Sequence, residues 1–155
     1  MVSPATTSSP SRRHAMTIDV EDYFHVSAFA KAIKPSEWDN WPSRVEHNTR
    51  SLLELFAEQN VKATFFVLGW VTERFPNLVK EIDEQGHEIA SHGYSHQLVY
   101  NQSPEVFREE TAKSKQLLEN IIQRPVVGYR AASYSITAKS FWALDILAEL
   151  GFTWD

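Results

Sequence analysis

The 155-residue sequence contains no cysteine, which excludes disulfide bridges and thiolate metal sites. A bound metal ion would therefore need histidine, carboxylate or backbone oxygen ligands. No apolar run approaches the ~20 residues that cross a bilayer. The first 16 residues also lack the apolar stretch of a secretory signal. We therefore expect a cytoplasmic protein without a membrane span.

A strong excess of either charge is also missing. The formal net charge is −5, and 43% of the residues are hydrophobic. These values are typical of a globular domain with a sizeable core. They give no reason to expect nucleic acid or an anionic membrane as a partner.

The chain divides into a polar tail and a patterned region. Residues 1–13 are rich in Ser, Thr and Pro, which predicts a disordered tail. Over residues 14–155, short apolar runs alternate with segments of helical spacing, a pattern typical of parallel β–α units. The runs that we interpret as strands are 15–20, 63–68, 88–90, 126–129 and 152–154. Because the last run closes the sequence, we expect a parallel (β/α) barrel that is truncated after about five strands.

Four segments between these runs have apolar residues on one helical face. Ser103 is the expected N-cap of the third helix, and Gly86 is the expected terminator of the second. The expected inward residues are Val45, Thr49, Leu52, Leu53 and Phe56; Leu78, Val79 and Ile82; Phe107, Thr111, Leu117, Leu118 and Ile121; and Phe141, Leu144, Leu147 and Ala148.

Polar side chains gather where the expected strands end, which is the edge that carries the chemistry in parallel α/β folds. Three acids follow the first strand, two histidines follow the third and one arginine follows the fourth. These residues are Asp19, Glu21 and Asp22, then His92 and His96, and then Arg130.

The histidine pair indicates a metal site. If the segment turns helically, His92 and His96 point the same way. One carboxylate from the first strand would complete a His₂–carboxylate set with positions open for water and substrate. Such a pair alone is common in ordinary loops, so this interpretation depends on its position opposite the acids.

The acids and the arginine have two interpretations. Acids at a strand end can be a solvated turn, and Arg130 can be a structural ion-pair partner. Asp19, however, lies within an apolar stretch, where a carboxylate needs a partner. Pairing with Arg130 would keep Asp19 ionised, as a general base must be. His25 is a further candidate for lining the cleft.

Four segments resemble, in order, the polysaccharide deacetylase family, that is, the NodB-type domain of carbohydrate esterase family 4. They are TIDVEDYFHV, KATFFVLGWV, GHEIASHGYSH and GYRAASYS. The likeness is greatest to the subgroup from bacterial exopolysaccharide loci, and it covers about residues 15 to 155. Residues 14–155 are therefore interpreted as the N-terminal part of such a domain. The resemblance implies a distorted barrel, a divalent metal that is usually zinc, and hydrolysis of N-acetyl groups on amino sugars of a polysaccharide or oligosaccharide.

The resemblance also implies roles by position. Asp19 corresponds to the catalytic base, Arg130 to the arginine that orients it, and His92 and His96 to the metal-binding histidines. The family's metal-binding acid closely follows the base, often as the next residue, but here Val20 intervenes. Glu21 and Asp22 both remain candidates. Glu21 shares a strand face with Asp19, whereas Asp22 would reach inward only at a bend.

Two departures from the family pattern concern the chemistry. The proline expected two residues after the arginine is Ala132, in the loop whose backbone N–H is expected to bind the oxyanion. Ser133 and Tyr134 of this loop are candidate substrate-binding residues. The family's catalytic acid, a histidine on a late strand, has no counterpart in the sequence. Alternative interpretations are a non-catalytic metal- or glycan-binding remnant and a hydrolase of small cyclic amides.

Overall fold

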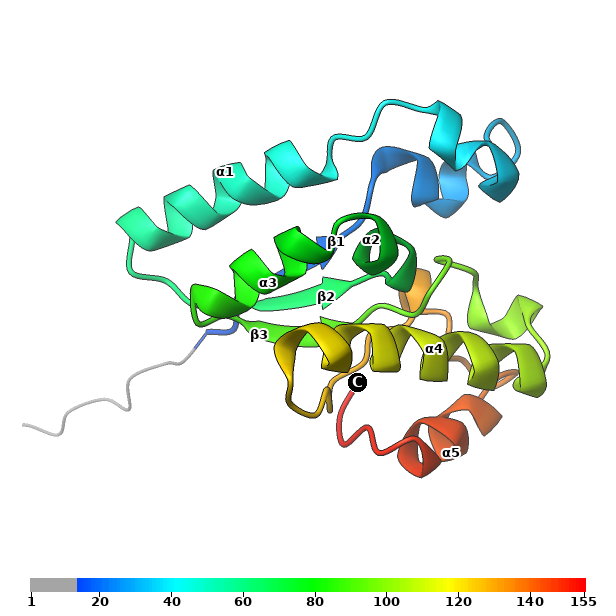
Figure 1. Ribbon diagram of the computed structural model, residues 1–155. Helices are drawn as coiled ribbons and strands as arrows, with labels where there is room; N and C mark the ends of the chain where they lie inside the picture. Colours follow the sequence, from blue (N-terminus) through cyan, green and yellow to red (C-terminus); the bar gives the residue numbers. More distant parts are fainter. Residues whose placement is uncertain (1–13) are drawn as a thin grey trace, which may run out of the picture.

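A computed structural model describes residues 14–155, so the tail predicted for residues 1–13 lies outside the described part. Three parallel strands form a sheet in the order β1–β2–β3. Helices α1, α3, α4 and α5 follow one another along the sheet, from top to bottom in Figure 1. The expected parallel α/β fold is therefore confirmed. The strands are Thr17–Val20, Thr64–Val67 and Glu88–Ser91, and the helices α1 to α5 are Val45–Glu58, Gly69–Arg74, Pro76–Glu84, Pro104–Ile122 and Trp142–Glu149.

Short 3₁₀ helices occupy the connections at the carboxyl ends of the strands. Three of them lie between β1 and α1, one precedes α4, and one follows Arg130. Because these connections share one end of the parallel sheet, they surround the edge where the sequence places its polar residues. The 3₁₀ segments are Tyr23–His25, Ser27–Phe29, Pro35–Asn40, Val99–Asn101 and Ala132–Tyr134.

The fourth and fifth expected strands are reduced to isolated bridges. Ser91 pairs with Tyr129, and Gly128 pairs with Trp154, both in parallel. The N–H of Arg130 donates to the carbonyl of Ser91 at 2.9 Å, and the N–H of Tyr129 donates to Trp154 at 3.0 Å. The apolar runs thus correctly predict which segments lie side by side. The prediction of full strands at 126–129 and 152–154 is wrong. Of the residues in these two runs, Gly128, Tyr129 and Trp154 form the bridges.

The predicted inward faces of the first three long helices are largely confirmed. Buried positions of α4 also include Ser114 and Ile122, while Leu117 and Ile121 are only partly buried. The Ser103 side chain caps α4 by accepting from the Val106 N–H at 3.3 Å. Gly86 follows α3 with φ +77°, a conformation that favours glycine.

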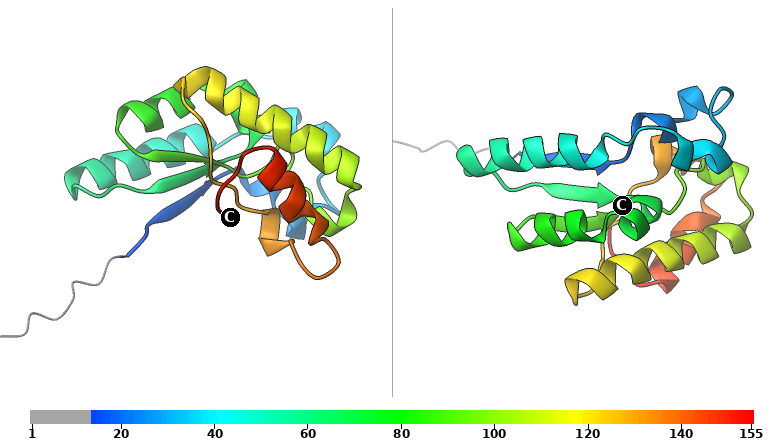
Figure 2. Two further views of the ribbon diagram at one scale, coloured as in Figure 1. Left: turned by 90° about the horizontal axis from the view of Figure 1, so that it is seen from below. Right: turned by 45° about the horizontal axis from the view of Figure 1, so that its top comes forward.

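The inward face of α5 differs from the expected one. The helix buries Ala143, Ile146 and Leu147, whereas Phe141 is 58% exposed and Leu144 is 43% exposed. This helix is apolar on more than one side, so helical spacing alone does not determine which stripe faces the core. Figure 2 shows α5 beside α4.

Gly69 allows α2 to approach the loop that follows β3. Its N–H donates to the Gly93 carbonyl at 2.8 Å, and the Trp70 N–H donates to Tyr94 at 3.0 Å. A Cβ at Gly69 would lie 2.5 Å from the Tyr94 ring and 3.1 Å from Ser114. The close packing of α2 therefore fixes the backbone of the histidine-bearing loop.

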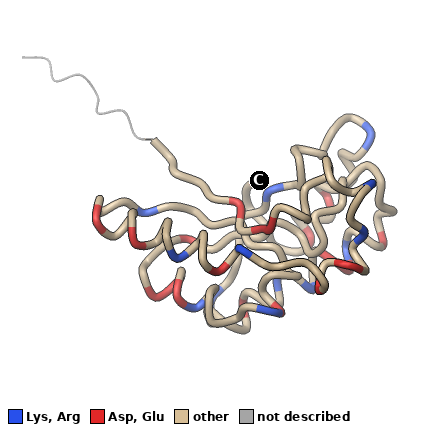
Figure 3. The backbone as a smooth tube through the Cα atoms, turned by 90° about the horizontal axis from the view of Figure 1, so that it is seen from above, with Lys and Arg blue, Asp and Glu red and all other residues tan. Residues whose placement is uncertain are grey.

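Basic and acidic residues are interspersed over the backbone in Figure 3 instead of separating onto opposite faces. Within residues 14–155, no helix combines the length and the hydropathy that a membrane span requires.

Candidate functional site

Three ligand-type side chains converge at the carboxyl ends of β1 and β3. One ligand atom each from Glu21, His92 and His96 lies within 4.8 Å of the others. Glu21 follows β1 directly, and the histidines follow β3. We call these residues the Glu–His cluster. It is the group among residues 14–155 whose geometry could hold a metal ion.

His92 is held in the tautomer that a metal ligand requires. Its side chain is buried, and its Nδ1 lies 2.8 Å from the carbonyl oxygen of Arg130. A carbonyl oxygen only accepts, so the ring proton of His92 is on Nδ1 and the Nε2 lone pair remains free. Burial lowers the pKa of His92, which favours the neutral ring.

His96 reaches the cluster from an irregular loop, so the two histidines meet without the helical turn that the sequence analysis gave as a condition. Residues 92–98 form no helix, and His96 has φ +52°, a conformation that is uncommon outside glycine. Gly93 has φ +76° in the same loop. These two turns bring the imidazole centroids of His92 and His96 to 5.2 Å. Burial, followed by the neighbouring His92, lowers the pKa of His96 to about 4.

Buried serines support this loop. The hydroxyl of Ser114, from α4, donates to the Gly93 carbonyl at 2.9 Å and lies 3.1 Å from the Ser91 hydroxyl. The Ser91 hydroxyl accepts from the Gly93 N–H at 3.2 Å. Sequence reasoning missed Ser114. Its signal was a small polar residue on the inward stripe of an amphipathic helix.

Glu21 is the carboxylate of the cluster, with its Oε2 3.1 Å from His96 Nε2. Burial, and then the negative charge of Asp19, raises the pKa of Glu21 to about 7. Its Oε2 is also buried without a hydrogen-bond partner, as is Nδ1 of His96. A buried carboxylate beside two neutral imidazoles lacks positive charge, which a divalent cation would supply. These residues therefore fit a metal ion.

Asp22 lies outside the cluster, and its carboxylate is already bonded. Oδ1 accepts from the Arg44 N–H at 2.8 Å, and Oδ2 accepts from the Ser43 hydroxyl at 2.5 Å. The Asp22 N–H donates to His25 Nδ1 at 2.8 Å. Asp22 thus ties the connection after β1 to the start of α1.

We expect Asp22→Ala to lower the free energy of unfolding by about 1–3 kcal/mol, because it leaves the donors of Ser43 and Arg44 without their acceptor. Urea unfolding followed by circular dichroism measures this change. Asp145→Ala, at an exposed position of α5, is the control and should change stability little. Equal stability of the two variants would contradict the structural role of Asp22.

The expected ion pair between Asp19 and Arg130 is present beside the cluster. Arg130 Nη1 lies 2.6 Å from Asp19 Oδ1, and Nη2 donates to the Thr17 hydroxyl at 3.1 Å. The guanidinium also lies 3.8 Å from the Phe66 ring centroid. The other Asp19 oxygen, Oδ2, is 3.9 Å from His92 Nε2. About a third of the Asp19 side chain is exposed, so water can reach this carboxylate.

Two residues of the loop after Arg130 are exposed and have an uncommon backbone. Ser133 and Tyr134 have φ +49° and +53°, and Tyr134 is 81% exposed. Tyr134 and Arg130 line a hollow of about 310 Å³ together with Asp155. Ser133 and Tyr134 are therefore accessible next to the Asp19–Arg130 pair. The Tyr134 N–H already donates to the Ala131 carbonyl.

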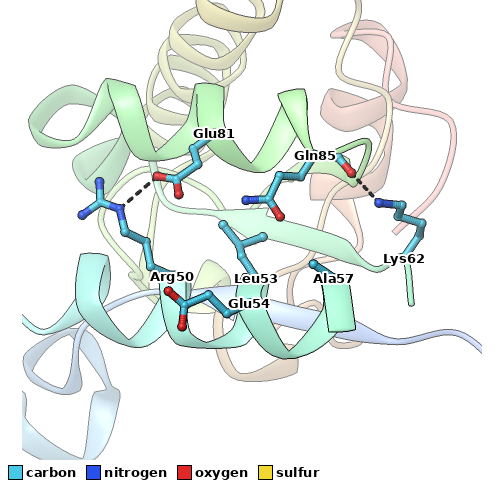
Figure 4. A pocket seen from close by; sticks show the side chains of 7 residues that line it. All are labelled: Arg50, Leu53, Glu54, Ala57, Lys62, Glu81 and Gln85. Carbon is cyan, nitrogen blue, oxygen red and sulfur yellow. Dashed lines mark hydrogen bonds and ion pairs between the residues drawn. The ribbon is translucent and has the colours of Figure 1, made fainter. Parts of the chain in front are cut away.

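A second hollow, of about 470 Å³, lies between α1 and α3 (Figure 4). Leu53 forms its floor, and the Arg50–Glu81 ion pair and the Lys62–Gln85 hydrogen bond span it. Lys62 and Gln85 precede β2 and β3. This hollow is thus at the opposite end of the parallel sheet from the Glu–His cluster.

Comparisons with family models, curated proteins and solved structures agree on one family. A family model described as polysaccharide deacetylase matches residues 36–154. The peptidoglycan-N-acetylglucosamine deacetylase of Bacillus cereus is 38% identical over 73 residues, which are 47% of this chain and 26% of that protein. The peptidoglycan deacetylase of Helicobacter pylori is 30% identical over 104 residues, which are 67% of this chain and 34% of that protein.

A solved structure extends the likeness across nearly the whole chain. It is of a protein from Mycobacterium smegmatis that is inferred to be a polysaccharide deacetylase, with 28% identity and a TM-score of 0.74. The match covers 98% of this chain and 54% of that one. The chain therefore spans about half the length of this solved structure and less than half of the two curated relatives.

Proposed function

The chain belongs to the polysaccharide deacetylase family, and we propose that it supplies the metal site and the catalytic base of a deacetylase. The reaction is hydrolysis of N-acetyl groups on amino sugars of a polysaccharide or oligosaccharide. The observation that carries this proposal is the Glu–His cluster beside a carboxylate that is paired with an arginine. The relatives' printed names support the substrate class, since both act on peptidoglycan.

Glu21, His92 and His96 are the proposed ligands, and zinc is the proposed ion. The two histidines and one carboxylate leave room for water and substrate, as a catalytic site requires. Glu21 is preferred to Asp22 because its Oε2 has no hydrogen-bond partner, whereas both Asp22 oxygens accept hydrogen bonds. When bound, a divalent cation supplies Lewis-acid polarisation of the acetamide carbonyl and a lower pKa for the attacking water.

Asp19 is the proposed base. Arg130 holds one of its oxygens at 2.6 Å, which fixes the direction of the carboxylate. The second oxygen faces the cluster and takes the proton from water as the water oxygen attacks the acetamide carbon. The C–N bond then breaks, which gives acetate and a free amino sugar. The backbone N–H groups of the loop after Arg130, apart from that of Tyr134, are the proposed contacts for the developing oxyanion.

The departing amine needs a proton, and no histidine of residues 14–155 is placed to provide it. His25 is close to the cluster, but burial and the neighbouring His96 lower its pKa to about 3. At neutral pH it therefore lacks the extra proton that a general acid gives up. This supports the proposal that the acid belongs to a part of the family domain outside residues 14–155.

The subgroup within the family and the location in the cell are further proposals. The segment TIDVEDYFHV, which contains Asp19 and Glu21, supports the exopolysaccharide-locus subgroup. The cytoplasmic location stays a prediction.

The direct test is acetate release from N-acetylglucosamine oligomers by a protein that carries this chain within a complete family domain. We expect turnover with added zinc, loss after dialysis against EDTA, and recovery when zinc returns. The 155-residue chain alone should be slower by about 10²–10⁴-fold, because no general acid is placed at the site by residues 14–155.

The outcomes separate the alternatives. Metal uptake without acetate release by either protein would instead support a non-catalytic role. Turnover of a small cyclic amide, but not of the oligomers, would assign small cyclic amides as the substrate class. Equal turnover by the two proteins would mean that the 155-residue chain holds its own acid.

A further inference from the structure

Helix α4 contacts the loop between the two histidines of the cluster through three side chains at i, i+3 and i+4, which are neighbours on a helix surface. Three consecutive loop residues receive these contacts, in reverse order. The pairs are Glu110 with Ser95, Lys113 with Tyr94, and Ser114 with Gly93. Every residue between His92 and His96 is therefore in contact with α4.

The contact next to His96 is a hydrogen bond to a carboxylate. The Ser95 hydroxyl donates to Glu110 Oε2 at 2.7 Å, and Ser95 directly precedes His96. Burial raises the pKa of the Glu110 carboxyl above its usual value, so keeping this acid in place costs solvation free energy. The adjacent Glu109 is exposed. Glu110 is thus not one of the ordinary solvated acids of α4.

His96 depends on its backbone for its position more than His92 does. A hydrogen bond to the Arg130 carbonyl orients the ring of His92, whereas Nδ1 of His96 is buried without a hydrogen-bond partner among the described residues. His96 also has φ +52°, and such a backbone conformation persists only where the surrounding contacts hold it. The contact that fixes the residue before His96 is the Ser95–Glu110 hydrogen bond.

We propose that Glu110 is a positioning residue for the metal site. Its hydrogen bond to the Ser95 hydroxyl fixes the backbone conformation of His96, and this conformation directs the His96 ring into the Glu–His cluster. Glu110 acts through the loop and is not a metal ligand itself. The inference rests on the proposed function for the role of the cluster, but the effect on the His96 ring does not require a bound ion. It can therefore be measured in metal-free protein.

The first measurement uses the 155-residue chain after dialysis against EDTA and follows the histidine ring signals by ¹H–¹³C NMR. His96→Ala identifies the His96 signals by their disappearance. We expect Glu110→Ala to shift the His96 signals and to leave those of His87 in place, because His87 precedes β3 and lies at the opposite end of the sheet. Glu109→Ala, at the adjacent exposed position of α4, is the matched control and should shift neither set.

The second measurement is a zinc titration of the same variants. We expect Glu110→Ala to bind zinc about 10-fold more weakly than the parent, the lower end of the loss that is typical for groups supporting a metal ligand. Glu110→Gln keeps an oxygen that accepts from the Ser95 hydroxyl, so it should bind zinc like the parent. This rescue distinguishes positioning by a hydrogen bond from an effect of the Glu110 charge.

Ser95→Ala tests the same hydrogen bond from its donor side and removes only one hydroxyl group. It should weaken zinc binding as much as Glu110→Ala does. The double variant should bind no more weakly than either single variant, because each change removes the same interaction. Ser95→Ala also carries the test if Glu110→Ala does not fold.

The outcomes are distinguishable from those of the proposed function. In a parent chain that binds zinc, equal affinity of Glu110→Ala and Glu109→Ala would overturn the positioning role, and so would His96 signals that stay in place in Glu110→Ala. A loss that Glu110→Gln does not restore, or additive losses in the double variant, would overturn it too, because the hydrogen bond would not be the cause. A parent chain that takes up no zinc, but whose His96 signals shift in Glu110→Ala, would support the positioning role and contradict the metal site.

Discussion

Replacing Asp19 with asparagine should slow acetate release by about 10²–10⁴-fold and leave the metal content unchanged. Asparagine keeps the shape of the side chain but cannot take the proton from the attacking water. It also lacks the charge that pairs with Arg130 at 2.6 Å. The turnover number in a protein with the complete family domain gives the rate, and elemental analysis of the same sample gives the metal content.

Asp145→Asn is the matched control for Asp19→Asn, because Asp145 is exposed on α5. It should keep normal turnover. If Asp19→Asn also turned over at nearly the normal rate, Asp19 would have only a structural role. Glu21, the other acid beside the histidines, would then be the candidate base.

Loss of either histidine of the cluster should abolish stoichiometric metal binding. We expect about one zinc or similar ion per chain in the parent and almost none in His92→Ala or His96→Ala, because two ligands do not hold a catalytic zinc. Elemental analysis after extensive dialysis measures the content, and zinc titration measures affinity. His47→Ala, at an exposed position of α1, should bind as the parent does.

The same titration decides between the two acids. Glu21→Gln should weaken zinc binding, whereas Asp22→Asn should bind zinc like the parent once the lower stability of the variant is taken into account. The reverse result would make Asp22 the ligand and would require the connection after β1 to rearrange. A folded parent chain that takes up no metal would contradict the ligand set as a whole.

Local signals in the sequence predicted those parts of the fold that depend on local chemistry. Ser103 and Gly86 were recognisable because a cap and a left-handed terminator need particular residue types. The buried face of α5 could not be predicted in this way, because Phe141 and Leu147 are equally apolar and only tertiary packing distinguishes them. The apolar runs near Gly128 and Trp154 predicted which segments lie side by side. They did not predict how few of their residues form β-bridges.

The candidate site shows the same limit. The approach of Asp19 to Arg130 followed from the topology of parallel strands, which needs no detail of the loops. The choice between Glu21 and Asp22 depended on Ser43 and its neighbour Arg44, which are distant in sequence and give no local signal. The i, i+4 spacing of His92 and His96 suits a helix, but the two residues meet through a loop in which Gly93 and His96 have positive φ angles.

Arg130 serves two partners with two chemically separate groups. Its guanidinium forms an ion pair with Asp19. Its main-chain carbonyl oxygen accepts a hydrogen bond from the protonated Nδ1 of His92. Side-chain mutagenesis therefore perturbs only the first of these interactions, and every amino acid at position 130 retains the second. An ester in place of the amide between residues 130 and 131 would weaken the carbonyl acceptor and keep the arginine. Semisynthesis can thus loosen the imidazole ring while the base stays paired, which no codon change at this position can do.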